Sequence, residues 1–452
     1  MATIDDLGSR VNLADEDGTP EPIRKPKGDS AAADIEAVRV RPRSDKFIWG
    51  IFVVLCLISI VELYSASSRE IVEGNILGPL FRHIALLGIG CLVMLGLQRV
   101  HYDYIYRFTV FIVAAAFVVG IYTFFWGDVI NGARRSFTLF GITIRASEVL
   151  KLTAALVIAR VLSVSQINGG RDISNRGVAT VAVIVLAFGL LLIKQGLTNT
   201  LIMMMISLSM MLIGGVSWRK WLIVVGIYGV LGLSYSGYKA LTGDDTSVAE
   251  RNQAVAAGQD TDRSHVRAAR MLNFMRGDKY NDEITSENAQ EMYSYIAQAN
   301  GGIFGVAPGN SRETARLPLA FTDYIYAIVV EDLGLVGGLA VIMLFIFLLA
   351  RAGRVATRCT KAYPALLVIG MAVFVTVQAL VHIGIVVGSF PVSGQPLPLL
   401  SKGGSSVLIT CVALGLMLSV SRHATRRDAR EEMRDRITTL SDKTYADNPT
   451  GL

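Results

Sequence analysis

The stretch that decides the fold is "LPLAFTDYIYAIVVEDLGL", residues 317–335. Its apolar part continues to about residue 350, which exceeds the roughly 20 residues that a helix needs to cross about 30 Å of hydrocarbon. An aspartate, Asp323, stands where this run begins, and two more acids, Glu331 and Asp332, follow within it. Carboxylates are costly at membrane depth and commonly mark function there. The stretch therefore predicts a membrane-spanning helix and raises the question of what the acid at its start does.

Composition extends this prediction to the whole chain. Of 452 residues, 52% are hydrophobic and only 18% are charged, and the mean hydropathy is +0.48. Such a chain carries more apolar surface than a soluble domain can bury. We therefore predict an all-α polytopic membrane protein with about ten transmembrane helices. The expected spans are 47–65, 80–97, 108–126, 147–165, 177–194, 198–215, 221–238, 322–350, 364–388 and 404–421.

Basic residues predict the orientation of these spans, because Lys and Arg gather on the cytoplasmic side. They fall in alternate connections, so that both termini are expected in the cytoplasm. The residues are Arg99, Arg107, Arg160, Arg171, Arg176, Arg219, Lys220, Arg351, Arg354, Arg358 and Lys361, followed by the tail residues Arg422, Arg426, Arg427 and Arg430. This pattern accounts for the net charge of +6 without a nucleic-acid partner.

The same reasoning gives the domain organisation. Residues 1–46 are predicted to be a disordered cytoplasmic tail, 47–421 a ten-span membrane domain and 422–452 a cytoplasmic C-terminal tail. Residues 239–321 form the large exoplasmic loop expected between spans seven and eight. Its length is typical of a functional or disordered loop.

Asp323 has two interpretations. Thr322 or Asp323 could cap the helix by accepting hydrogen bonds from its free backbone amides. A charged carboxylate at the membrane surface could instead act as a general base. Position in the sequence does not choose between them.

The deeper acids need partners within the helix bundle. Glu148 and Lys151 share a helix face in "SEVLKL" and offer both signs of charge. We expect Glu331 and Asp332 to join them, either in an ion-pair network that fixes packing or in contact with substrate.

Two segments on the predicted exoplasmic side carry cations. Arg134, Arg135 and Arg145 lie in "NGARRSFTLFGITIR", where they either anchor lipid headgroups or bind a diphosphate. Lys402 lies in the Gly- and Pro-rich segment 388–406, which is either a plain connection or an irregular loop that lines a wet cavity. No Cys/His metal cluster, nucleophile elbow or phosphate-binding glycine loop is evident, and His382 is interpreted as a packed or hydrogen-bonded residue.

Six motifs in order resemble the SEDS family (shape, elongation, division and sporulation) of bacterial membrane proteins. They are "LYSAS" at 63–67, "NGARR" at 131–135, "SEVLKL" at 147–152, "GGIFGVAPGNS" at 301–311, "LPLAFTDYIYAIVVEDLGLVG" at 317–337 and "PVSGQPLPLLSKGGSS" at 391–406. The short segments are more similar to the FtsW branch than to the RodA branch. The resemblance covers about residues 47–421.

The resemblance implies a peptidoglycan glycosyltransferase that polymerises lipid II, the undecaprenyl-pyrophosphate-linked disaccharide-pentapeptide, outside the bacterial inner membrane at the division site. It implies that Asp323 is the essential acid, and we interpret it as the base of an inverting transfer. Candidate substrate-binding residues are Arg134, Arg135, Glu148, Lys151, Lys402 and Ser405. A divalent cation such as Mg²⁺ could share the charge of the departing undecaprenyl pyrophosphate. A class B penicillin-binding protein and other divisome membrane proteins are the implied partners.

Other classes stay open at this point. Charged residues within spans and a Gly/Pro-broken loop are also typical of a lipid II flippase or another secondary transporter. A division scaffold and a RodA-like elongation polymerase are further alternatives.

Overall fold

The computed structural model describes residues 44–66, 77–130, 133–139, 142–167, 172–193, 195–242, 274, 284, 288–313, 316–317 and 321–423. Most of the two predicted tails, and much of the predicted loop 239–321, lie outside these ranges. All structural statements below concern the described part of the chain.

A helix stands at each of the ten predicted span positions. They are α2 (Lys46–Ala66), α3 (Leu77–Leu97), α4 (Tyr102–Trp126), α5 (Ala146–Val164), α6 (Asn175–Ile193), α7 (Leu197–Ile213), α8 (Trp218–Thr242), α12 (Ile325–Ala356), α13 (Ala362–Val386) and a last helix, Gly404–His423. Seven of the described helices are long and apolar enough to cross a membrane; α5, α7 and α8 are the other three at predicted positions. The all-α polytopic prediction is confirmed.

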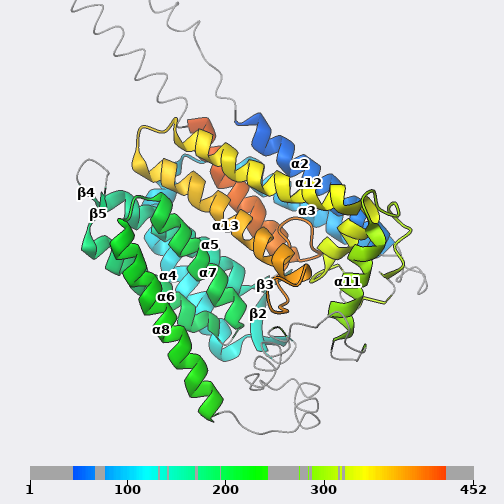
Figure 1. Ribbon diagram of the computed structural model, residues 1–452. Helices are drawn as coiled ribbons and strands as arrows, with labels where there is room; N and C mark the ends of the chain where they lie inside the picture. The colour runs from blue at the N-terminus through cyan, green and yellow to red at the C-terminus, as the bar shows by residue number, and fades with distance from the viewer. Residues whose placement is uncertain are drawn as a thin grey trace, which may run out of the picture. The chain divides into compact units, whose positions relative to one another are not determined.

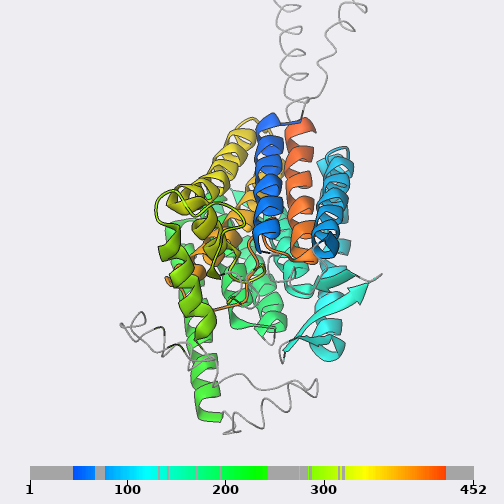
Figure 2. The same cartoon turned by 90° about the vertical axis from the view of Figure 1, so that its right-hand side faces the viewer.

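The helix α13 forms the centre of the bundle. Within its spanning window 83% of the residues are buried, against 22% for α3 and α4. It runs beside α12 and also contacts α5 and α7 (Figure 1, Figure 2). Residues of α13 can therefore connect side chains from several parts of the bundle.

A small antiparallel sheet occupies the predicted connection 127–146, where no strand was predicted. Its strands are β1 (Asp128–Ile130), β2 (Ala133–Leu139) and β3 (Ile142–Arg145), in the order β1-β2-β3. Ser136 pairs with Arg145 and Phe137 with Ile144 across β2 and β3. Alternating β-branched and aromatic residues in "SFTLFGITI" favour such a hairpin.

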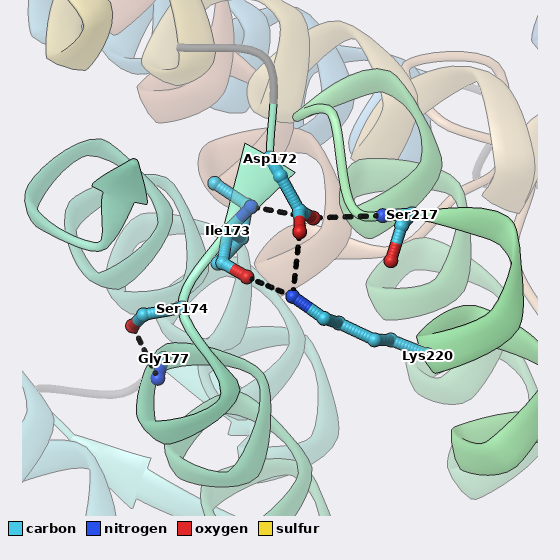
Figure 3. A network of polar contacts seen from close by, with 6 residues as sticks. All are labelled: Asp172, Ile173, Ser174, Gly177, Ser217 and Lys220. Carbon is cyan, nitrogen blue, oxygen red and sulfur yellow. Dashed lines mark hydrogen bonds and ion pairs between the residues drawn. The ribbon is translucent and has the colours of Figure 1, made fainter. Parts of the chain in front are cut away.

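A second short hairpin, β4 (Gln166–Ile167) and β5 (Asp172–Ile173), is tied to the start of α8 (Figure 3). The Lys220 ammonium donates to Asp172 Oδ2 at 2.7 Å and to the Ile173 carbonyl at 2.6 Å, while the Ser217 amide donates to Asp172 Oδ1 at 3.2 Å. The hydrogen bond from Lys220 is the main reason that the pKa of Asp172 lies below its usual range. The network fixes the connection between α5 and α6 against α8.

The helix α12 is broken rather than continuous. Gly334 has φ 70° and ψ −175°, which only glycine adopts readily. The turn after α11 (Ala289–Gly301) fills the break. Amides of Val306 and Ala307 donate to the carbonyls of Glu331 and Asp332, and amides of Leu335 and Val336 donate to the carbonyls of Gly302 and Ile303. The backbone groups released by the break are thereby paired, as membrane depth requires.

Candidate functional site

Asp323 lies just before α12 and is partly exposed. The residue at the helix cap is Tyr324, whose side chain makes no capping hydrogen bond, and Asp323 lies one residue before it. The Asp323 carboxylate lies against Gly394 of the connection between α13 and the last helix, so closely that a Cβ on Gly394 would come within 2.8 Å of Asp323 Oδ2. The carboxylate is therefore placed between the start of α12 and this connection.

Residues 389–403, hereafter the 389–403 loop, are fastened to the segment that carries Asp323. The Ser401 hydroxyl donates to the Thr322 carbonyl at 2.8 Å and accepts from the Leu397 amide at 2.7 Å. The Lys402 amide donates to the Phe321 carbonyl at 2.8 Å. Such pairing of an irregular backbone is what burial within protein demands, and it fixes the loop beside Asp323.

Lys402 brings positive charge to this place. Its ammonium lies 4.9 Å from the centre of the Phe321 ring, two residues before Asp323. Ser405 is buried in the first turn of the last helix. A helix start and a nearby lysine together favour an anion. The structure thus brings Asp323 and Lys402 to one region, with Ser405 three residues beyond Lys402.

Glu148 and Lys151 form the predicted pair. Their side chains are buried and joined by a 2.7 Å ion pair, and the Gln378 amide of α13 donates to Glu148 Oε2 at 2.7 Å. Desolvation opposes burying the two charges, but their mutual contact and the added hydrogen bond offset part of that cost. The sequence predicts this pair but not its contact with Gln378.

The expected partnership of this pair with Glu331 and Asp332 is wrong. Glu331 instead accepts hydrogen bonds from the Ser311 hydroxyl and from the backbone amide of Arg312 at 3.0 Å. Asp332 accepts from the Ser65 hydroxyl, which itself accepts from the Gly309 amide at 2.9 Å. Backbone amides and hydroxyls stabilise a buried carboxylate without a countercharge, although Asp332 Oδ1 has no hydrogen-bond partner among the described residues. Through these contacts, residues 309–313 are attached to α2 by way of Ser65 and to α12 by way of Glu331.

The backbones of Arg134 and Arg135 lie in β2, and Arg134 pairs with Val129 of β1. The positions of their side chains are outside the described part of the structure. Their assignment to substrate stays a prediction.

The described residues contain no group of three or more His, Cys, Asp or Glu side chains arranged to hold a metal ion. Mg²⁺ is usually held by one or two carboxylates together with water and substrate phosphates. A magnesium ion at Asp323 would accordingly take most of its ligands from substrate and water.

His382 confirms its interpretation as a hydrogen-bonded residue: its Nδ1 lies 2.6 Å from the Gln395 carbonyl. The sequence does not single out Ser401, and it marks Gly394 only as one residue of the Gly- and Pro-rich segment. The density of Gly and Pro in 388–406 was the available signal, since such a loop has to be fastened by side chains.

Comparisons with known proteins agree with this architecture. A family model described as "Cell cycle protein", for FtsW, RodA and SpoVE, matches residues 45–426. A Halomonas elongata protein named "Probable peptidoglycan glycosyltransferase FtsW" is 31% identical over 314 residues, 67% of this chain and 71% of its own. A Coxiella burnetii protein of the same name is 27% identical over 384 residues, 82% of this chain and 95% of its own.

One solved structure with a similar fold is described as "Structural coordination of polymerization and crosslinking by a peptidoglycan synthase complex". It is 23% identical, has a TM-score of 0.64, and the alignment covers 84% of this chain and 98% of the other. The fold and the site thus define a polytopic membrane protein with an acid held beside an irregular loop. The chain belongs to the FtsW/RodA/SpoVE family, which confirms the SEDS resemblance, and it is FtsW-like.

Proposed function

We propose that this chain is a peptidoglycan glycosyltransferase that polymerises lipid II, with Asp323 as general base. One observation carries the proposal: the carboxylate of Asp323 is held between the start of α12 and the 389–403 loop, with Lys402 close by. The names of the related proteins support the same activity.

The reaction is an inverting transfer. Asp323 accepts the proton of the 4-hydroxyl of the acceptor sugar while that oxygen forms a bond to the anomeric carbon of the donor. The bond from this carbon to the diphosphate breaks, and undecaprenyl pyrophosphate leaves with the electron pair. An ordinary aspartate pKa of about 3.9 makes a weak base near neutral pH, so accurate positioning has to supply much of the rate.

Cations stabilise the charge on the leaving diphosphate. Lys402, whose ammonium lies by the Phe321 ring, and the start of the last helix at Ser405 are the first candidates for this role. Lys151, paired with Glu148, and the arginines Arg134 and Arg135 are further candidates for the diphosphate. Each of these roles is a proposal about substrate contact.

We further propose that the protein resides in the bacterial inner membrane with both termini in the cytoplasm and the Asp323 site on the outer side, and that it acts at the division site. The positions of Lys and Arg in alternate connections support this orientation. The proposed partners are a class B penicillin-binding protein that crosslinks the strands and other divisome membrane proteins. The structural similarity to a synthase complex that both polymerises and crosslinks peptidoglycan supports the first of them.

The decisive experiment compares the purified protein with its Asp323→Asn variant in detergent, with lipid II, with and without its cognate transpeptidase. Asparagine preserves size and hydrogen bonding and removes basicity. We expect glycan strands on a gel from the parent and at least a hundredfold lower rate from the variant. Equal rates at equal folded concentration would show that Asp323 is not the base.

One observation favours a second candidate, a lipid II flippase or other transporter, because broken helices such as α12 at Gly334 are common in secondary transporters. Detergent separates the two functions, since it leaves no compartments to transport between. Strand synthesis in detergent supports the polymerase, whereas lipid II movement in vesicles without strand synthesis supports the transporter.

A further inference from the structure

His382 lies near the end of α13, the central helix of the bundle. Its side chain is almost wholly buried, with 1% exposed, and its Nδ1 lies 2.6 Å from the backbone carbonyl of Gln395. A carbonyl oxygen only accepts hydrogen bonds, so Nδ1 carries the proton and donates it. Nε2 has no hydrogen-bond partner among the described residues. The imidazole therefore makes one directed contact, and that contact is with the 389–403 loop.

This contact falls next to the site. Gln395 follows Gly394, and Gly394 is the residue against which the Asp323 carboxylate lies. The Gln395 amide donates back to the Ser393 carbonyl at 2.9 Å, which makes a tight turn of residues 393–395. A displacement of the Gln395 carbonyl would move this turn and change the surface facing Asp323.

Other attachments lie on both sides of this turn. At the start of the loop, the amides of Ser389 and Phe390 donate to the Gly384 carbonyl at 2.7 and 3.1 Å. Ser401 and Lys402 fasten its end to Thr322 and Phe321. His382 binds the middle of the loop from the largely buried helix α13. A side chain supported by a packed helix is a more accurate anchor than one on a loop.

We propose that His382 is a positioning residue for Asp323: by donating Nδ1–H to the Gln395 carbonyl, it sets the turn 393–395 against the carboxylate. The inference rests on the proposed function, because it assigns His382 a part in the geometry of that reaction. His382 takes no proton from substrate in this role.

The face of α13 that carries His382 gives it a second connection. Gln378 precedes it by four residues, one turn away, so both side chains leave the same face of the helix. Gln378 binds Glu148, the partner of Lys151. One face of α13 thus joins the buried Glu148–Lys151 pair to the turn beside Asp323, which links two groups of candidate residues that come from different helices.

The test compares two substitutions at this position. His382→Asn keeps a donor in the same place, because asparagine Nδ2 and histidine Nδ1 both lie two bonds beyond Cβ. His382→Leu keeps apolar volume and removes the donor. Both variants, the parent and Asp323→Asn are purified in detergent, and the rate of lipid II polymerisation is measured against lipid II concentration and pH.

We expect His382→Leu to lower kcat by roughly tenfold or more with KM within about twofold, since the loss acts on the reacting geometry rather than on binding. His382→Asn should restore kcat to within about threefold of the parent, with the same dependence on pH. An unchanged kcat in His382→Leu overturns the inference, as does an equal loss in both variants. Disappearance of a limb of the pH profile in His382→Asn also overturns it, because the imidazole would then exchange protons itself.

Size-exclusion profiles and thermal midpoints establish which variants fold. Where His382→Leu fails to fold, His382→Asn decides alone, and a loss as large as that of Asp323→Asn contradicts the positioning role. An inactive parent refutes the proposed function instead. An active parent, an inactive Asp323→Asn and a fully active His382→Leu refute only the inference.

Discussion

Gly394 offers a direct perturbation of the Asp323 carboxylate without a change in the carboxylate itself. In Gly394→Ala the new Cβ would lie 2.8 Å from Asp323 Oδ2, whereas ordinary contacts begin at 3.4 Å. The carboxylate or the turn therefore has to move by about 0.6 Å. Gly394 is exposed and is not among the residues with positive φ, so alanine fits its backbone and the fold should not suffer.

The expected loss of rate follows from this displacement. A misplacement of about 1 Å costs up to a hundredfold in enzymes, so Gly394→Ala should lower kcat by roughly tenfold, or about 1.4 kcal/mol in activation free energy. The assay is the initial rate of glycan-strand formation from lipid II in detergent, at saturating substrate and equal concentrations of folded protein.

The matched control is Gly403→Ala in the same loop. Its Cβ would meet its nearest neighbour, the Cβ of Ser406, at 3.5 Å, which is an ordinary contact. We expect parental activity from this variant. If Gly394→Ala keeps the parental kcat while its thermal midpoint is unchanged, the idea that Asp323 works through its position against this loop is refuted.

Three other predictions concern the framework around the site. Glu331→Gln removes the negative charge of the side chain that accepts hydrogen bonds from the Ser311 hydroxyl and the Arg312 amide, which should weaken the attachment of residues 309–313 by about 1–3 kcal/mol. Amide hydrogen exchange in this segment should accelerate, and unchanged protection from exchange would contradict the attachment. Gly334→Ala introduces a Cβ that overlaps the Ile303 carbonyl, at a positive φ that disfavours alanine, so the thermal midpoint should fall steeply. The control Gly232→Ala has open space around the new Cβ and should leave the thermal midpoint almost unchanged. The pKa of Asp172 is lower in the folded state than in the unfolded state, so its ionised form stabilises the protein above the unfolded pKa of about 3.9, and this contribution is lost as pH falls through the lower folded pKa. Asp172→Asn should therefore lower the thermal midpoint at pH 5–8. The difference in thermal midpoint between the parent and the variant should narrow only below about pH 4.

The positions of the spanning helices could be predicted from the sequence because their signal is local. Twenty or so apolar residues fix a span regardless of what packs beside it, and each of the ten predicted spans coincides with a helix. The break in α12 could not be predicted in this way. Gly334 lies in an apolar run that has the pattern of one helix, and the turn that fills the break comes from residues 302–307, which the chain brings there only on folding.

In the candidate site, too, contacts between residues close in the sequence could be predicted and contacts between distant segments could not. Glu148 and Lys151 are three residues apart, so helix geometry alone predicts their contact, and the structure contains it. The partners of Glu331 and Asp332 are hydroxyls and backbone amides from distant segments. A sequence shows which residues are charged, but it does not show which backbone amides are free to donate hydrogen bonds to a carboxylate. The prediction of an ionic partner was wrong for that reason.

These attachments give the Asp323 carboxylate a fixed place. A fixed place matters for the proposed reaction, because accurate positioning of a reacting group supplies much of the rate of an enzyme. Asp323 is fixed from two sides. On one side it directly precedes α12, to which Glu331 and, through Ser65, Asp332 fasten residues 309–313. On the other side the 389–403 loop faces it, fastened by Ser401 and His382. Glu331 and Asp332 thus affect Asp323 by holding residues 309–313 in place and not by a direct charge interaction. Substitutions at Glu331 should therefore change kcat only as far as they move residues 309–313 and, with them, the start of α12.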